Sequence, residues 1–145
     1  MTAYDDQNIF ARILRGEIPC HRVYENRHTL AFLDIMPRSP GHTLVIPKAA
    51  ARGIFDIAAD DFAEVARTAK KVALAAVKAF DAEGVIVQQF SEAASGQVVF
   101  HLHMHVMPMR TGVDLLPPQT RKEDAKTLEH HAARLIDALR DPSSG

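Results

Sequence analysis

The sequence predicts an α+β fold, and three observations support this prediction. Five short runs of strand-forming residues lie between residues 22 and 107, and most are joined by short polar loops, which favour antiparallel pairing. Two longer runs repeat their apolar residues at helical spacing and lie outside the paired strands. The 145 residues, 47% of them hydrophobic, suit a single domain with its own core. We therefore expect one α+β domain over residues 1–145, with a five-stranded antiparallel sheet and flanking helices.

The clearest helix is expected from Asp60 to Phe80, where apolar residues recur every three or four positions. Either Asp60 or Asp61 can cap its N-terminus through a carboxylate oxygen. A short helix is expected over residues 8–15, ended by Gly16, because glycine tolerates the left-handed conformation that closes a helix.

A C-terminal helix is expected from about residue 121 to residue 140. Thr120 and Glu123 have the spacing of a capping box at its start. The remaining pattern is of strands, and a polar turn between the first two predicts a hairpin. The five expected strands are 22–25, 29–33, 43–46, 85–90 and 98–107.

Charge and cysteine content exclude several classes of function. The 17 basic and 18 acidic side chains give a formal net charge of −1, so no basic field favours nucleic acid or a membrane surface. No apolar run approaches the roughly 18 residues of a membrane span. A lone cysteine, Cys20, cannot form an internal disulfide, which indicates a reducing compartment. We expect a cytoplasmic protein without nucleic-acid or membrane partners.

The most informative run is His101-Leu102-His103-Met104-His105-Val106-Met107. Side chains alternate between the two faces of a strand, so His101, His103 and His105 should share one face. Three imidazoles contribute little to a core and cost free energy to desolvate. The pattern therefore predicts a functional site rather than a structural face.

Two kinds of chemistry fit alternate histidines. They can ligate a metal ion such as Zn²⁺, or a neutral imidazole can attack an electrophile while its neighbours bind the developing charge. The small-residue turn 93–97 can bring backbone N–H groups to an anion, and His42 follows a second tight turn. Only Glu92 lies near as an acid that could support metal-bound histidines. This favours a phosphate site, although a metal site and an exposed polar strand face stay open.

The histidine run resembles the signature of the histidine triad (HIT) family of nucleotide hydrolases and transferases. Three further segments, 9–19, 30–35 and 40–48, resemble other parts of that family in the expected order. The resemblance covers about residues 8–110 and leaves the C-terminal helix outside. It implies the family's five-stranded antiparallel sheet, and a homodimer paired through a helix and a strand, with the helix 60–80 as our candidate.

The resemblance implies a role for each matching residue. His103 would be the nucleophile on the α-phosphorus of a purine nucleotide and would form a nucleotidyl-histidine. His105 and His101 would bind the phosphate and manage the leaving group's proton, supported by His42. Phosphate oxygens would meet Gly96 and Gln97. The nucleoside would be held by Asp34 at the ribose and by a base pocket of Phe10, Ile13, Ile18, Phe32 and Ile35.

The resemblance implies no metal or other cofactor. Some relatives hold a structural zinc with two cysteines, where this chain has Asn8 and Ala11. Val98 stands where a hydroxyl residue is common, and Phe90 or Ser91 where asparagine is common. The alternatives are a nucleotide-sensing module with little turnover and a histidine-ligated metal site. The sequence does not separate phosphoramidates from dinucleoside polyphosphates as substrates.

Overall fold

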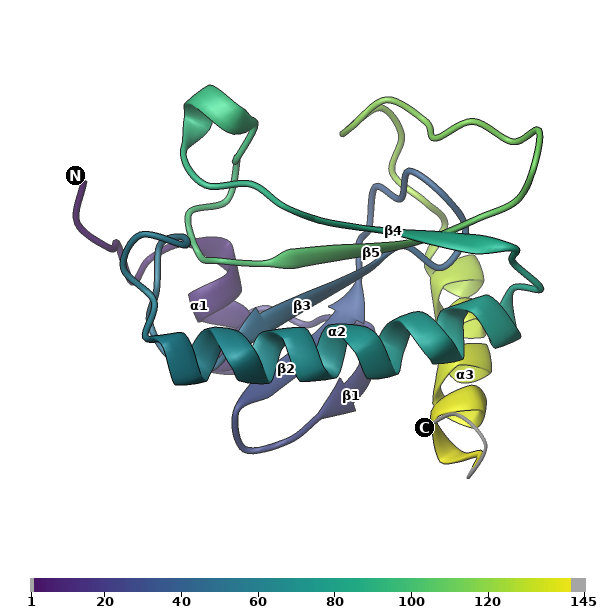
Figure 1. The fold of residues 1–145 in the computed structure, drawn as a ribbon, viewed down its shortest axis with the longest axis horizontal. Coiled ribbons are helices and arrows are strands. Elements are labelled where there is room, and N and C mark those ends of the chain that lie inside the picture. Colours follow the sequence, from purple (N-terminus) through teal and green to yellow (C-terminus); the bar gives the residue numbers. More distant parts are fainter. Residues whose placement is uncertain (1, 142–145) are drawn as a thin grey trace.

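The computed structural model describes residues 2–141 and confirms the α+β class, with a five-stranded antiparallel sheet in the order β1-β2-β3-β5-β4 (Figure 1). The strands are β1 (Arg22–Glu25), β2 (Thr29–Leu33), β3 (Thr43–Pro47), β4 (Gly84–Gln89) and β5 (Met104–Met109). The helices are α1 (Ile9–Leu14), α2 (Ala59–Ala79) and α3 (Ala125–Arg140), with a 3₁₀ turn at Ala93–Ser95. None of the helices among the described residues is long and apolar enough to cross a membrane.

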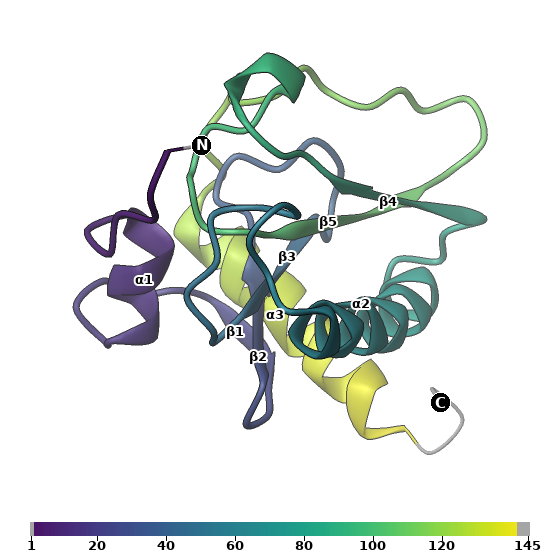
Figure 2. The ribbon, with the colours of Figure 1, turned by 60° about the vertical axis from the view of Figure 1, so that its left-hand side comes forward.

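Helices cover both faces of the sheet centre (Figures 1 and 2). On one face, α2 and α3 bury a core that includes Val45, Val72, Leu102, Val106 and Leu135. On the other, α1 covers a smaller core formed by Phe10, Leu30, Phe32, Leu44 and Ile46. Every residue of β2 and β3 is therefore buried, whereas β4 lies at the edge of the sheet.

The β1–β2 hairpin and α1 confirm most directly what the local sequence predicts. β1 and β2 have the predicted bounds, and Asn26 Oδ1 accepts the backbone N–H groups of His28 and Thr29, both at 2.8 Å, which fixes the turn. Asn8 caps α1 by accepting from the Ala11 N–H at 2.9 Å. Gly16 follows α1 with φ +77°.

The expected N-caps of the two long helices are wrong. The N-cap of α2 is Ala58, without a side-chain hydrogen bond, and Asp60 and Asp61 lie within its first turn. Their charges still lie near the positive end of the helix dipole. The bounds of α2 differ from the predicted ones by a single residue at each end.

The capping box predicted for the C-terminal helix does not form, and α3 begins at Ala125. Its cap is Asp124, which accepts from the Thr127 N–H at 3.3 Å. Thr120 instead donates to the Pro117 carbonyl. The Glu123 N–H donates to the carbonyl of Ile35 at 2.8 Å, so the preceding segment is tied to the end of β2 rather than to the helix.

The last strand is shorter than predicted, because residues 98–103 lie outside β5. Pairing with β3 ends at Val45 opposite Met104, and pairing with β4 ends at Gln89 opposite the same residue. Pro47, farther along β3, has no N–H to extend the ladder. The expected alternation nevertheless holds, because Leu102 and Val106 lie in the core beneath α2.

Gly41 allows α2 to pack against the turn before β3. A Cβ atom there would lie 2.4 Å from the Phe80 ring, and the residue has φ +87°. The ring cannot easily withdraw, because it packs edge-on against His131 and beneath the Arg134 guanidinium. Only glycine meets both requirements at this position.

We predict that Gly41→Ala lowers the free energy of unfolding by about 2–4 kcal/mol, from the strained φ and the overpacked contact together. Gly16→Ala is the matched control, because it has a similar φ of +77° with nothing within 4 Å of the added Cβ. It should lose only about 1 kcal/mol. Urea unfolding of both variants measures the difference, and equal losses would show that the Phe80 contact is unimportant.

Candidate active site

A cleft of about 570 Å³ lies between α1, the ends of β2 and β3, β5, and the loop that follows β4. It brings together ten of the predicted site residues: Phe10, Ile13, Ile18, Phe32, Asp34, Ile35, His42, Gly96, His103 and His105. His101 and Gln97 do not line it. The predicted base pocket and the predicted catalytic histidines therefore share one cavity, with His101 and Gln97 behind its wall.

The tautomer of His103 follows from its hydrogen bond. Its Nδ1 lies 2.7 Å from the backbone carbonyl oxygen of His101. A carbonyl can only accept, so Nδ1 carries the proton and Nε2 keeps an unshared electron pair. Phe10 packs edge-on against the ring, with centroids 4.9 Å apart, and the residue is only 7% exposed. The ring is thus fixed by one hydrogen bond and by edge-on contacts with Phe10 and with His105.

A second chain of hydrogen bonds sets the tautomers of His42 and His105. The backbone N–H of Arg38 donates to His42 Nδ1 at 3.0 Å, so the proton of this ring lies on Nε2. His42 Nε2 then donates to His105 Nδ1 at 2.9 Å. This leaves the proton of His105 on Nε2, where it can act as a hydrogen-bond donor. The cleft therefore combines an imidazole lone pair from His103 with an imidazole N–H from His105.

His101 supports the site from behind. Its Nε2 donates to the Pro47 carbonyl oxygen at 2.9 Å, and its Nδ1 accepts from the Tyr4 hydroxyl at 2.7 Å. Both ring nitrogens are satisfied and the residue is fully buried. The sequence does not reveal the role of Tyr4, because Tyr4 lies 97 residues from its partner and belongs to no local pattern.

Burial keeps these imidazoles neutral. Desolvation lowers the pKa of His42 and of His105 to about 3, helped by the neighbouring histidines and Arg38. Desolvation likewise lowers the pKa of His101 to about 4, and it lowers that of His103. Neutral imidazole is the nucleophilic form, so a buried site suits nucleophilic chemistry at neutral pH.

Among the described residues, one group of side chains could hold a metal ion. Its members are Asp34, His42 and His105, whose ligand atoms lie within 4.8 Å of one another. The hydrogen bonds argue against that use of His42, because its Nε2 carries a proton and donates to His105. Asp34 Oδ1 accepts from the Met36 N–H at 2.8 Å, and burial raises the pKa of this carboxyl. His42 and His105 are thus joined by a hydrogen bond, while Asp34 Oδ2 lies 3.6 Å from His42 Nε2.

The loop before the histidines is held by its own hydrogen bonds. The N–H groups of Gly96 and Gln97 donate to the carbonyls of Ala93 and Glu92. The Gln97 amide accepts from the Glu92 N–H at 2.6 Å and donates to the Arg52 carbonyl at 2.7 Å. Gln97 is thus a buried tie between the loop and the segment after β3, and Gly96 alone of the pair faces the cleft.

An ion pair adds to that tie. Arg52 binds Glu92 through two hydrogen bonds of 2.8 and 3.0 Å, and its guanidinium lies 4.1 Å from the centre of the Phe100 ring. The loop reaches the cleft in one conformation because side-chain contacts fix both of its ends.

Gln88 is a further polar residue of the cleft. It pairs with His105 across the two strands, and its buried Oε1 has no hydrogen-bond partner among the described residues. A buried acceptor without a partner is costly, so this atom is suited to a donor on a ligand. Gln88 can be recognised as a cleft residue only from the β4–β5 register, which the sequence does not show.

Comparison with known proteins identifies the family. The HIT domain model matches residues 15–112. The chain belongs to the HIT family. An uncharacterised 13.2 kDa HIT-like protein of Azospirillum brasilense is 46% identical over 109 residues, which are 74% of this chain and 89% of that protein. An adenosine 5′-monophosphoramidase of Schizosaccharomyces pombe is 39% identical over 100 residues, 69% of this chain and 72% of the relative.

Solved HIT structures share the whole fold. A HIT-like protein of Bartonella henselae, described as involved in cell-cycle regulation, superimposes with a TM-score of 0.91 at 45% identity. The match covers 94% of this chain and 99% of that one, so it extends beyond the region of the original resemblance and includes most of the C-terminal part. Family membership supports nucleotide binding or hydrolysis in general.

The lowered histidine pKa values predict a loss of stability in acid. An unfolded histidine has a pKa near about 6.5. Below that pH the histidines of the unfolded state become protonated. In the folded state His42, His101 and His105 stay neutral until the pH falls to about 3 to 4. The free energy of unfolding therefore falls as the pH falls. The raised pKa of Asp34 acts in the opposite direction and offsets part of the loss.

Between pH 7 and 5 the loss should approach roughly 2 kcal/mol for each of these histidines as an upper limit. Urea unfolding at the two pH values and constant ionic strength measures it. A stability that stays level over this range would contradict neutral burial of the rings.

Proposed function

We propose that this HIT protein is a nucleotide phosphohydrolase that acts by double displacement through His103. The observation that carries the proposal is the unshared electron pair of His103 Nε2 in a cleft that also holds the His105 N–H. Its relationship to an adenosine 5′-monophosphoramidase supports the same class of reaction. No metal or other cofactor is part of the proposed chemistry.

In the first step, His103 Nε2 attacks the α-phosphorus and forms a P–N bond. The bond from phosphorus to the leaving group breaks, and the leaving group keeps the electron pair and takes a proton from solvent. The phosphorylated imidazole is cationic, and its Nδ1–H remains bonded to the His101 carbonyl, which stabilises the positive charge. The His105 N–H donates to oxygen or nitrogen where negative charge develops.

In the second step, water attacks the same phosphorus. The P–Nε2 bond breaks and its electron pair returns to His103, while the water gives one proton to solvent and leaves its oxygen on the nucleotide. The histidine ends in the tautomer in which it began, so the ring needs no rearrangement between turnovers. Fixed rings cost little reorganisation during reaction.

The cleft also supports the proposed nucleoside site. Phe10, Ile13, Ile18, Phe32 and Ile35 form an apolar wall suited to a purine base. Asp34 stands at the end of β2 beside it, with a side chain 20% exposed. Its Oδ2 lies 3.6 Å from His42 Nε2, and we assign it to the ribose diol. Gly96 lets the phosphate approach the loop without steric hindrance, and Gln97 keeps that loop in place.

The proposed substrates are purine nucleoside phosphoramidates or dinucleoside polyphosphates. The name of the fission-yeast relative favours the phosphoramidate. Pro118 and Gln119 line the far end of the cleft, where they would meet the leaving group. A cytoplasmic location and a single domain over the whole chain remain part of this proposal.

The first test is AMP release from adenosine 5′-phosphoramidate by metal-stripped protein. We expect His103→Ala to lower kcat by roughly 10³-fold or more, because the nucleophile is lost. AMP should still bind, since the base wall and Asp34 are untouched. His130→Ala, on the exposed side of α3, is the control and should keep full activity.

The same assay separates the two alternatives. Release at equal rates by native protein and His103→Ala would overturn the nucleophile. Activity that needs added Zn²⁺ would favour a metal site built on Asp34, His42 and His105. AMP binding without turnover on any of the proposed substrates would favour a nucleotide-sensing module.

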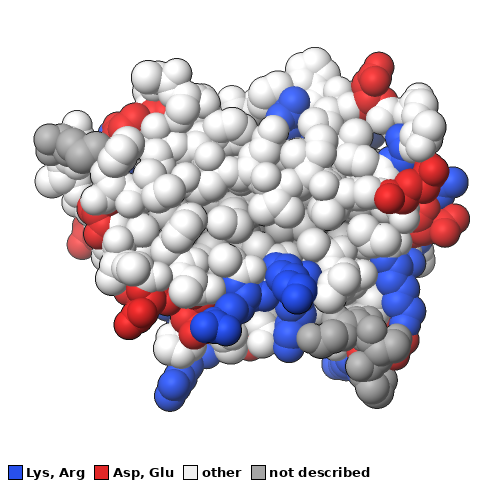
Figure 3. Space-filling view, in the orientation of Figure 1, with Lys and Arg blue, Asp and Glu red and all other residues white. Residues whose placement is uncertain are grey.

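We further propose that the chain forms a homodimer through α2 and β4. As an edge strand, β4 has one side of its backbone unpaired within the sheet, and Val85 and Val87 are 37% and 46% exposed. Leu74 of α2 is 46% exposed. Figure 3 shows that the middle of this face is free of charged side chains, which lie along its lower and outer margins. A two-fold axis would pair the same apolar surface with itself.

Sedimentation analysis tests the dimer. Val87→Asp should shift the protein to monomer, because it places a charge in the centre of the apolar face. Ile54→Asp is the control. Ile54 is similarly exposed, at 45%, but it lies in the loop before α2 rather than in β4. A native protein that sediments as a monomer at micromolar concentration would refute the interface.

A further inference from the structure

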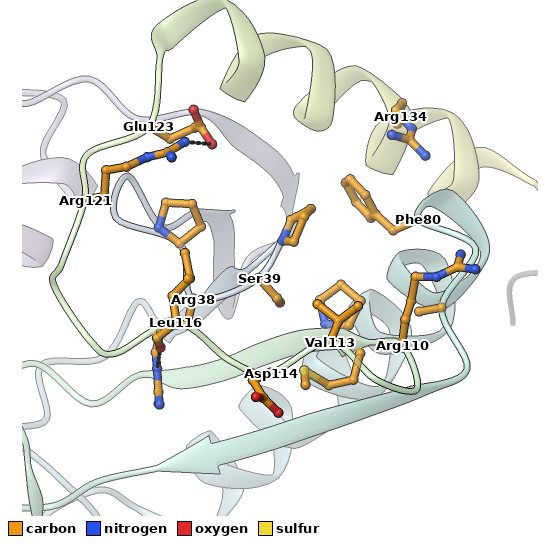
Figure 4. A pocket seen from close by; sticks show the side chains of 15 residues that line it. Arg38, Ser39, Phe80, Arg110, Val113, Asp114, Leu116, Arg121, Glu123 and Arg134 are labelled. Atoms are coloured by element: carbon orange, nitrogen blue, oxygen red, sulfur yellow. Dashed lines mark hydrogen bonds and ion pairs between the residues drawn. The ribbon is translucent and has the colours of Figure 1, made fainter.

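A second cavity of about 550 Å³, nearly as large as the catalytic cleft, lies beyond the turn at residues 37–40. Figure 4 shows its walls, which come from that turn, the end of α2, the end of β5, the loop before α3, and α3 itself. Phe80 stands at the end of α2, Pro108 lies in β5, and Arg134 lies in α3. The residues that line it belong to none of the roles proposed above except Arg38, which lines both cavities.

Two hydrogen bonds close the wall between the cavities. The Arg38 side chain donates from Nε to the Leu116 carbonyl oxygen at 2.8 Å, and the Leu116 N–H donates to the Arg38 carbonyl at 2.9 Å. They join the turn at residues 37–40 to the loop before α3. The second cavity is therefore a separate site rather than an extension of the nucleotide cleft.

The lining carries more positive than negative charge. Its charged residues are Arg38, Arg110, Arg121, Arg134, Asp114 and Glu123. Arg121 pairs with Glu123 at 3.6 Å, and Arg110 pairs with Asp81 at 3.2 Å.

The other two arginines contact neutral groups. Arg38 donates to the Leu116 carbonyl, and Arg134 donates to the Ala79 carbonyl and lies 4.5 Å above the Phe80 ring. A carboxylate beside Arg134 would gain charge-assisted hydrogen bonds that the Ala79 carbonyl does not supply.

Ser39 lines the cavity and carries a buried hydroxyl. Ser39 is 8% exposed, and its Oγ has no hydrogen-bond partner among the described residues. Figure 4 shows this side chain in the middle of the ring of lining residues. A buried hydroxyl without a partner costs free energy, and a polar atom of a ligand that reached it would supply the missing hydrogen bond. The surfaces around it are flat and apolar, formed by Pro37, Pro40, Pro108 and Phe80.

We propose that this cavity binds a small organic monoanion with a flat apolar body, of the class of aromatic carboxylates. The proline and phenylalanine surfaces would take the body, Ser39 would bind a polar atom of the ligand, and Arg134 would take the carboxylate. Asp114 in the lining disfavours a ligand with several negative charges. The proposal does not depend on the hydrolysis proposed for the cleft.

The test uses 2-naphthoate as the probe and 2-naphthamide as its neutral analogue, titrated into the full chain and followed by amide chemical shifts. The naphthoate should bind saturably, with shift changes gathered at residues 37–40 and 108–116. The amide should bind at least tenfold more weakly, because it cannot form the ion pair. Changes confined to the residues around His103 would place the probe in the cleft and overturn the proposal.

Variants locate the recognition chemistry. Arg134→Met keeps the apolar stem and should weaken naphthoate binding about tenfold without affecting the amide. Ser39→Ala, a smaller change, should weaken both probes several-fold. Arg67→Met is the control, because Arg67 is an exposed arginine of α2 outside the lining.

Urea unfolding shows whether each variant is folded. Should Arg134→Met unfold, Ser39→Ala alone decides the result. Equal affinities of naphthoate for native protein and for folded Ser39→Ala and Arg134→Met would refute the site, as would the absence of saturable binding.

Discussion

The hydrogen bond from His103 Nδ1–H to the His101 carbonyl is the contact on which the proposed chemistry depends. It decides which nitrogen of His103 keeps a lone pair, and therefore whether this ring is a nucleophile. The carbonyl is held in place by its surroundings. The His101 ring is fixed between Pro47 and Tyr4, and the next N–H, from Leu102, donates to the Ala51 carbonyl at 2.8 Å. The late start of β5, at Met104, makes this possible, because a regular strand over residues 101–103 would commit these groups to a neighbouring strand.

Hydrogen bonds that fix a tautomer also let the protein bury a cluster of histidines. Each ring has partners that fix its proton, so none needs to be charged, and desolvation then keeps the pKa values low. A backbone N–H from Arg38 begins one chain and a backbone carbonyl ends the other. Backbone groups are stable references for a tautomer, since their donor and acceptor roles cannot change. The rings of the cleft therefore already have the tautomers that the proposed chemistry needs.

The turn at residues 37–40 links several parts of the molecule. It supplies the N–H that orients His42, and its Arg38 side chain ties the loop before α3 to the sheet. Gly41, directly after it, allows Phe80 at the end of α2 to approach. The two cavities lie on either side of this turn and share Arg38 in their linings. A short irregular segment thus connects catalytic geometry, helix packing and the proposed second site.

The sequence by itself determined the features that depend on neighbours along the chain. The hairpin bounds, the span of α2 and the alternation of Leu102 and Val106 follow from local periodicity and turn chemistry. The resemblance to the HIT family identified the residues that gather in the cleft. Tertiary structure decided what local patterns do not encode: the start of α3, the late start of β5, and the tie made by Gln97. It also fixed the tautomers of the catalytic rings and the place of Tyr4. These depend on partners up to 97 residues apart, whose hydrogen bonds exist only once the chain has folded.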